Sequence, residues 1–471
     1  MFSIRMKKHL LYIMFFIATA FCAVACKEPV DDPQEQPIPE MLSCTVEEGS
    51  YVPVSTERIT IRYSHAVNVA DQQQITLVDE LSQNVAFELQ AANVNLNINL
   101  TEGLFYNKSY TLSVKSGAVC GANGGEIVED PYTVSFCAEE RILPVDEFNI
   151  DSTLTNPNPS DEAKALYSYL KNNFGKQTLS GAMAKYTVQI NEAEWMNTHT
   201  GKYPAIACFD FMNATRQKEY ENWDEPYTTL ITNAQNWVNN GGIVSIMWHW
   251  RDPLRENDAF YSMKTNNNPR TDFNVSKIHD TNSTEYKAMI KDIDYIAEYL
   301  KQLQDLNIPI LWRPLHEAQG GWFWWGAKKA EDAVALWNLM YDRLTNHHKL
   351  NNLIWVWTIT QKDDADDWYP GHETVDIVGA DIYQDHNKQH NSYKEYFDFV
   401  KAVSGGKKIV ALSECGPIPS AENMQRNGDY WSFFMPWNGD YTQSDSFNGA
   451  SFLTKLFESE FVITRDEVEI E

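Results

Sequence analysis

Positive charge is scarce in this sequence of 471 residues. It contains 38 lysine and arginine residues against 65 aspartate and glutamate residues, a formal net charge of −27. Proteins that hold nucleic acid or anionic membranes electrostatically need a basic surface to meet the phosphates. The charge balance therefore argues against a nucleic-acid partner and against direct attraction to anionic lipid.

The motifs of several enzyme classes are also missing. The sequence has no Cys-x-x-Cys pair, no Gly-x-Ser-x-Gly around a nucleophilic serine and no glycine-rich phosphate loop. A metal hydrolase would carry His-x-His at the end of its first barrel strand, or a His-Glu-x-x-His helix. Here the first expected strand ends in Ser180-Gly-Ala-Met-Ala184, and His316-Glu317 has no second histidine three residues later. We therefore expect neither a metal nor an organic cofactor.

The N-terminus has the pattern of a cleaved export signal. Arg5, Lys7 and Lys8 precede an uncharged run of 16 residues, Leu10–Ala25, which is short for a membrane span. The run ends in Ala23-Val24-Ala25-Cys26. This resembles the lipobox of bacterial lipoproteins, in which the cysteine becomes the acylated first residue. An ordinary secretory signal with a coincidental cysteine is the alternative.

We accordingly expect residues 1–25 to be removed and residues 26–43 to form a lipidated tether. Lys27–Ser43 holds four prolines and five acidic residues, which favour an extended, solvated chain. An acidic stretch directly after the cysteine also resembles the surface-export signal of some Gram-negative glycan degraders. We expect a monomer anchored through lipid on Cys26 to the outer membrane, on the cell surface rather than the periplasmic face.

Few cysteines remain once this leader is set aside. Cys22 is removed and Cys26 is acylated, and the other five are Cys44, Cys120, Cys137, Cys208 and Cys415. Because five is odd, at least one thiol stays free in an oxidising compartment. The sequence leaves open a bridge between Cys137 and either Cys44 or Cys120.

Residues 44–140 read as a small all-β domain. Apolar and polar residues alternate with period 2, and turn residues separate the runs. About seven short strands in such a length are typical of an immunoglobulin-like sandwich. Such a module can act as a spacer or as a carbohydrate-binding unit. The clearest strands are Arg58–Tyr63, Asn95–Leu100, Ser109–Val114 and Tyr132–Phe136.

Residues 141–471 alternate buried-strand runs with longer amphipathic stretches such as Glu285–Leu306 and Ala330–His347. Eight strands alternating with helices predict a (β/α)₈ TIM barrel. The expected strands are Thr178–Met183, Ala205–Met212, Gly242–Trp250, Pro309–Glu317, Asn352–Thr358, Asp376–Tyr383, Lys407–Gly416 and Tyr430–Trp437.

Two of these strands end in glutamate. The active site of a barrel lies at the C-terminal ends of its strands, so Glu317 on the fourth strand and Glu414 on the seventh should face each other across its mouth. Either residue alone would be a solvated rim carboxylate. A facing pair is what glycoside hydrolysis requires, since one carboxyl protonates the leaving oxygen and the other attacks the anomeric carbon. The 15 tryptophans and 23 tyrosines also suit a ligand with flat apolar faces edged by hydroxyls.

The segment Trp312-Arg-Pro-Leu-His-Glu-Ala-Gln-Gly-Gly-Trp-Phe-Trp-Trp-Gly326 resembles the signature of glycoside hydrolase family 26, which consists mostly of β-mannanases. Val244–His249, Asp376–Tyr383 and Leu412–Glu414 are similar to further blocks of that family, in the same order. The resemblance covers roughly residues 145 to 468.

The resemblance implies roles for particular residues. Glu317 matches the acid/base of the family, and Glu414 matches its nucleophile. The positions that match the lining of the cleavage subsites are His249, Arg313, His316, Trp322, Tyr383 and Trp437.

Some of these side chains have a second interpretation. Arg313 could meet sugar hydroxyls or form a structural salt bridge, and Tyr383 could donate to Glu414 or be an ordinary strand-end aromatic. Trp437 is expected to form the stacking floor under the reacting sugar. Trp324 and Trp325 either extend the cleft or cap the barrel.

The family likeness implies a retaining hydrolase that cleaves β-1,4-mannosidic bonds in mannan, glucomannan or galactomannan. The same mechanism on β-1,3-xylan or mixed-linkage β-glucan is the alternative, and both internal and terminal cleavage fit the sequence. A non-catalytic glycan-binding surface lipoprotein is the second class of function. The presence of both glutamates disfavours it.

Overall fold

The computed structural model describes residues 37–80, 82, 84–101, 104, 108–122, 125–139, 149–185, 187–214, 227–360, 364–384 and 390–470. The expected signal segment, and with it Cys26, lies outside these residues. The chain divides into a smaller N-terminal and a larger C-terminal compact unit, whose main boundary lies close to Cys137. In the part of the chain described, no helix combines the length and apolarity that crossing a membrane requires.

The smaller unit is a sandwich of two four-stranded sheets, ordered β1-β3-β7-β6 and β2-β10-β8-β5, with β4 and β9 as a separate pair. Alternate residues of β3 point inward, so that Ile59, Ile61 and Tyr63 are buried. The predicted all-β sandwich is confirmed. Its strands are β1 (Met41–Cys44), β2 (Tyr51–Val52), β3 (Arg58–Tyr63), β4 (Val67–Val69), β5 (Ile75–Asp79), β6 (Phe87–Ala92), β7 (Asn95–Leu100), β8 (Ser109–Val114), β9 (Val119–Gly121) and β10 (Tyr132–Ala138), with a short helix η1 (Gln72–Gln74).

The five cysteines within the described residues are all free. Cys44, Cys120 and Cys137 of the sandwich form none of the bridges that the sequence left open. Cys208 and Cys415 are buried in the larger unit. The sandwich is therefore held by its core rather than by a covalent cross-link.

The larger unit is a closed parallel barrel, which confirms the predicted (β/α)₈ fold. Its sheet runs β12-β13-β16-β17-β18-β19-β20-β11, and a further pairing of β11 with β12 closes the ring. Each barrel strand lies within one of the eight predicted runs, except that β17 extends one residue beyond the predicted end of its run. The strands are β11 (Thr178–Met183), β12 (Ile206–Asp210), β13 (Ile243–Trp248), β16 (Ile310–Pro314), β17 (Leu353–Ile359), β18 (Ile377–Ile382), β19 (Ile409–Cys415) and β20 (Phe433–Pro436), with β21 (Val462–Ile463) paired beside β11.

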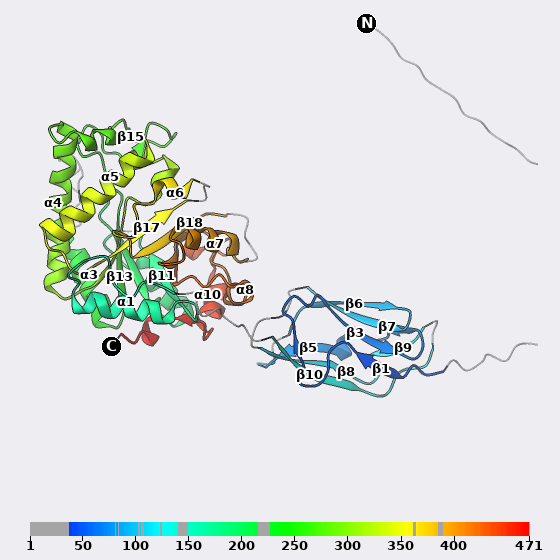
Figure 1. Ribbon diagram of the computed structural model, residues 1–471. Coiled ribbons are helices and arrows are strands. Elements are labelled where there is room, and N and C mark those ends of the chain that lie inside the picture. The colour runs from blue at the N-terminus through cyan, green and yellow to red at the C-terminus, as the bar shows by residue number, and fades with distance from the viewer. Residues whose placement is uncertain are drawn as a thin grey trace, which may run out of the picture. The chain divides into compact units, whose positions relative to one another are not determined.

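Helices surround the barrel strands (Figure 1). They are α1 (Asp161–Asn173), α2 (Asn191–Thr200), α3 (Tyr227–Asn239), α4 (Thr284–Asp305), α5 (Ala330–Tyr341), α6 (Ala365–Trp368), α7 (Lys394–Val403), α8 (Ala421–Asn427), α9 (Asp440–Gln443) and α10 (Ala450–Phe457). Shorter elements are β14 (Tyr261–Ser262), β15 (Arg270–Thr271), η3 (Val275–His279), η4 (Ala318–Gly320), η5 (Trp324–Gly326) and η7 (Arg465–Glu467).

Helix α4 agrees with the predicted stretch Glu285–Leu306. It begins after Ser283, whose side chain accepts a hydrogen bond from the Tyr286 backbone N–H, and its apolar positions face the barrel. The stretch Ala330–His347 differs from the prediction. It is α-helical only to Tyr341 and continues as a wider π-helical segment, η6 (Asp342–His347). Hydrophobic periodicity does not distinguish these two windings over a single turn.

Candidate active site

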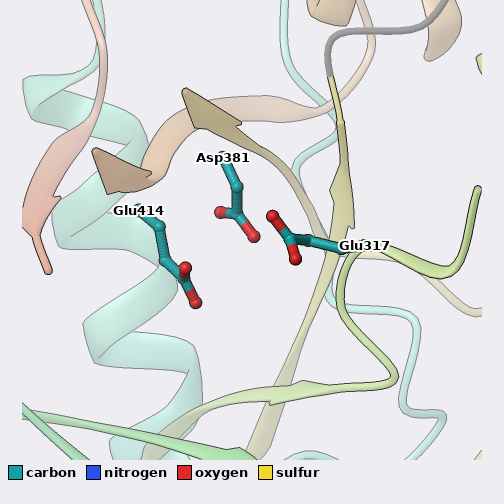
Figure 2. Close-up of side chains that lie close together, drawn as sticks. All are labelled: Glu317, Asp381 and Glu414. Carbon is teal, nitrogen blue, oxygen red and sulfur yellow. The ribbon is translucent and has the colours of Figure 1, made fainter. Parts of the chain in front are cut away.

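Three carboxylates meet at the C-terminal ends of the barrel strands. Glu317 follows β16, and Asp381 and Glu414 lie on β18 and β19. One oxygen of each lies within 4.8 Å of one oxygen of each of the others. Figure 2 shows the three carboxyl groups close together, with Glu317 carried by a loop and Asp381 and Glu414 by strands. Glu317 and Glu414 are therefore brought together as the sequence predicts.

The backbone that carries Glu317 is unusual. Leu315 and Glu317 both have positive φ, at 52° and 54°, although neither is glycine. Non-glycine residues rarely adopt this region, and such strain persists where the surrounding structure enforces it, often at functional sites. The turn directs the Glu317 side chain back toward β19.

Glu414 is held in place by two donors. Its side chain is buried, Tyr383 donates from its hydroxyl to Oε2 at 2.7 Å, and Arg313 donates to Oε1. Both contacts stabilise the ionised carboxylate and fix its orientation. Glu414 is thus held in one orientation by an ion pair and a hydrogen bond.

Arg313 provides the positive charge of the cluster. Its guanidinium is buried and donates to Asp381 at 3.0 Å as well as to Glu414. Burial alone would lower the pKa of Arg313, but the Glu414 and Asp381 carboxylates outweigh it, so that the pKa rises and the charge is permanent. Of the two interpretations of Arg313, the structure contains the ion pair, and one of its two partners is Glu414; the contact with a sugar hydroxyl stays a prediction.

Asp381 is a site residue that the sequence reasoning missed. A register irregularity between β18 and β19 places it opposite Glu414, and it accepts from Ser413 Oγ at 2.8 Å. Burial and the nearby Glu414 charge raise the pKa of Asp381 well above its usual range. The available signal was its position two residues before Tyr383 at the end of a predicted strand.

Glu317 has the opposite electrostatic environment to Glu414. Burial of its carboxyl and the Glu414 charge raise the pKa of Glu317 to about 8, against smaller opposing effects of Trp322 and Arg313. Trp322 donates its indole N–H to Glu317 Oε2 at 2.7 Å. Glu317 therefore keeps its proton at neutral pH. Two carboxyls with such different surroundings are suited to acid and nucleophile roles.

The two predicted histidines lie side by side. The ring centroids of His249 and His316 are 4.6 Å apart. His249 is fixed by Asp210 at the end of β12, which accepts from its Nδ1 at 2.6 Å and from its backbone N–H at 3.0 Å. This leaves His249 Nε2 for other partners. The sequence reasoning did not identify Asp210, because 39 residues separate it from His249.

His316 is buried among cationic and aromatic neighbours. Burial, His249 and Arg313 together lower the pKa of His316 well below its usual range, so the ring is neutral. Its Nδ1 has no hydrogen-bond partner among the described residues. A buried polar atom of this kind needs a partner, and a bound hydroxyl group could provide one.

The aromatic side chains fall into two groups. Trp322, Tyr383 and Trp437 are partly exposed beside the carboxylates, and the Trp437 ring lies 5.9 Å from His249. Trp324 and Trp325 are fully buried. They therefore do not extend an exposed binding surface.

A polar insert after β13, Arg255–Asn282, packs against the loop that carries Glu317. Ser262 donates its backbone N–H to the Trp322 carbonyl and its hydroxyl to the Gly321 carbonyl, both at 2.7 Å. Gly326 lies so close to Ala318 that an added Cβ would sit 1.7 Å from the Ala318 carbonyl oxygen. The insert and this tight packing together support the turn at Glu317.

The sequence matches a known family over most of this unit. Residues 155–467 match the family described as glycosyl hydrolase family 26. The chain belongs to glycosyl hydrolase family 26. Residues 35–137 match the family described as bacterial Ig-like domain. Both findings confirm the resemblance and the fold that the sequence indicated.

Relatives in family 26 support this assignment. A mannan endo-1,4-β-mannosidase of Thermothelomyces thermophilus is 33% identical over 426 residues, which cover 84% of this chain and 85% of the relative. The crystal structure of a β-mannanase from a symbiotic protist of the termite Reticulitermes speratus, complexed with gluco-manno-oligosaccharide, superposes with a TM-score of 0.65. It is 38% identical, with 69% of this chain and 99% of that chain covered.

A GH26-CBM35 β-(1,4)-mannanase from Podospora anserina is similar over a longer stretch. Its crystal structure has a TM-score of 0.63 at 29% identity, with 92% of this chain and 97% of that chain covered. The chain is thus similar to mannan-cleaving enzymes over nearly its whole length.

Proposed function

We propose that this protein is a mannan endo-1,4-β-mannosidase that retains anomeric configuration. The observation that carries the proposal is the carboxylate pair. Glu317 and Glu414 each have an oxygen within 4.8 Å of an oxygen of the other; this short spacing favours the direct attack of retaining glycosidases, because inverting ones hold their carboxyls further apart to leave room for a water. The relatives named above supply the substrate class.

In the first step Glu414 attacks the anomeric carbon and Glu317 donates its proton to the departing glycosidic oxygen. A covalent glycosyl–Glu414 ester forms, and the carbon–oxygen bond to the leaving sugar breaks. Glu317, now ionised, then takes a proton from water, whose oxygen attacks the anomeric carbon and releases Glu414 as carboxylate. Each glutamate returns to its starting protonation state.

The side chains around the two glutamates suit a bound sugar and the charge changes that the two glutamates undergo in the reaction. Tyr383 and Arg313 orient Glu414, and Trp437 offers a stacking surface. Mannose carries an axial 2-hydroxyl, and His249, Arg313 and His316 are our candidates for the contact with it. Glucan and xylan carry this hydroxyl equatorially, which would leave the same groups partly unpaired at a cost of about 1–3 kcal/mol.

The first product released should retain the β configuration. In the proposed mechanism Glu414 attacks directly, without an intervening water, so two successive displacements restore the original configuration. Proton NMR of manno-oligosaccharide hydrolysis in its first minutes resolves the two anomers before mutarotation. Early accumulation of the α anomer would require a single displacement and overturn the role of Glu414.

Purified protein kept in chelator should release manno-oligosaccharides from β-1,4-mannan faster than it releases products from β-1,3-xylan or lichenan. Internal cleavage should lower the viscosity of galactomannan before much reducing sugar appears. Chromatography of the products on the three polysaccharides provides the measurement. Faster release from lichenan or xylan would change the substrate and leave the catalytic pair as assigned.

We further propose that Cys26 carries lipid and anchors a monomeric enzyme to the outer membrane, facing the cell exterior. Loss of residues 1–25 removes three basic residues and leaves 35 basic against 65 acidic ones, a net charge of −30. Such a chain has little attraction for anionic lipid, so its membrane association should depend on acyl chains.

A Cys26→Ala variant should therefore appear in the soluble fraction, whereas the wild type sediments with membranes. Protease treatment of intact cells, followed by blotting, distinguishes surface from periplasmic placement. A Cys44→Ala variant controls for the general loss of a cysteine. Full membrane association of the Cys26→Ala protein would contradict the lipid anchor.

A further inference from the structure

Glu192 is a buried carboxylate outside the catalytic cluster. It lies on α2, and its exposed fraction is 1%. Its Oε2 accepts the Lys185 backbone N–H at 2.9 Å, and its Oε1 accepts the Gly439 backbone N–H at 3.2 Å. A buried carboxylate is costly unless both oxygens are hydrogen-bonded, and these two contacts meet that need.

The two contacts join different barrel loops. Lys185 lies in the loop after β11, and Gly439 lies in the loop after β20, two residues beyond Trp437. Gly439 has φ of 65° and ψ of −127°, a conformation that side-chain-bearing residues avoid. Glu192 therefore holds the chain where it turns sharply after the tryptophan.

The remaining contacts of this loop fix the Trp437 backbone. Its N–H donates to the Cys415 carbonyl at 2.9 Å, next to Glu414 in sequence, and its carbonyl accepts from Thr442 Oγ1 at 2.8 Å. Trp437 itself is only partly buried, so packing alone does not determine where its ring lies. Glu192 adds a further anchor at Gly439, two residues beyond Trp437.

We propose that Glu192 is a positioning residue that sets the height of the Trp437 ring under the reacting sugar. This inference rests on the stacking role of Trp437 in the proposed function. It explains why a carboxylate is buried here, because an isosteric glutamine offers only one acceptor oxygen. The amide N–H₂ of a glutamine would face one of the two backbone N–H groups. The loop that carries that N–H group would then lose its hydrogen bond to residue 192.

Glu192→Gln should lower kcat/KM about 10- to 100-fold, mainly through kcat, since misplacement of a binding group by about 1 Å can cost 10²-fold. Glu194→Gln is the matched control, because Glu194 lies on the exposed face of the same helix. Titration with a 2-fluoro-glycosyl inactivator that carries the sugar the wild type cleaves counts the folded active sites, so that kcat is expressed per folded site and a loss caused by misfolding does not enter it.

A double-mutant cycle with Trp437→Ala separates positioning from general stability. If Glu192 acts through Trp437, Glu192→Gln should change kcat/KM less than twofold in the Trp437→Ala background. The same loss in both backgrounds, or no loss in the single variant, would overturn the proposal. If Glu192→Gln does not fold, Glu192→Asp replaces it in the cycle, since its shorter side chain cannot span both N–H groups.

The cycle is measured on whichever polysaccharide the wild type cleaves. If the substrate assignment is wrong, the wild type will cleave another polysaccharide faster than mannan. The effect of Glu192→Gln can still be measured on that polysaccharide.

Discussion

Glu414→Ala should reduce the hydrolysis of mannan by on the order of 10⁴-fold or more. The variant lacks the atom that forms the covalent bond, and neither Tyr383 nor Arg313 can replace it. Asp381 is close, but it is paired with Arg313 and Ser413 on the neighbouring strand. The first step is therefore lost on both natural and activated substrates.

Azide provides a positive test of this variant. The space left by the Glu414 carboxyl admits a small anion, which should attack an activated aryl β-mannoside and give the α-mannosyl azide. Glu422→Ala on α8 is a matched control, since Glu422 is paired with Lys455 away from the three carboxylates. A β-mannosyl azide from Glu414→Ala would mean that the nucleophile is another residue.

Glu317→Ala should reduce the rate on mannan by about 10²–10⁴-fold, the usual contribution of general acid–base catalysis. A dinitrophenyl leaving group needs little protonation, so a burst of dinitrophenol should persist while release of the covalent intermediate becomes slow. Azide should accelerate that release and give the β-mannosyl azide, the configuration opposite to that from Glu414→Ala. Equal losses on mannan and on the activated glycoside would require the two roles to be exchanged.

The pH profile of the wild type follows from the same residue. Because the pKa of Glu317 is raised to about 8, the protonated acid is present below that pH and is lost as the pH rises through it. kcat/KM should therefore fall on the alkaline side with an apparent pKa far above that of an ordinary glutamate. The kcat/KM of a Glu317→Gln variant should not show this fall at alkaline pH.

The strand pattern and the two glutamates could be predicted because both depend on local sequence. Each barrel strand is a short apolar run, and the barrel places any residue at the end of such a run at the mouth. Local sequence therefore placed Glu317 and Glu414 at the mouth, and their pairing and the family motif around them indicated their roles. The side chains that match the family motif could be located in the same way.

The remaining features depend on contacts between distant segments. Asp381 faces Glu414 only because the register of β18 and β19 shifts at that point. The pairing of Asp210 with His249 and the burial of Trp324 arise from loops that meet only in the folded barrel. Glu192 joins Lys185 to Gly439, a residue 247 positions away, and no local pattern distinguishes it from the exposed Glu194.

The central claim is that Glu414 becomes covalently bonded to the sugar. A 2-deoxy-2-fluoro-mannosyl donor with a good leaving group should slow the second step and trap this intermediate, and peptic digestion with mass spectrometry then locates the label. The account predicts one fluoromannosyl group per chain, on the peptide that contains Glu414, and its loss on transfer to an added mannoside acceptor. A label on Glu317 or Asp381, or steady turnover of the donor without any labelled peptide, would contradict it.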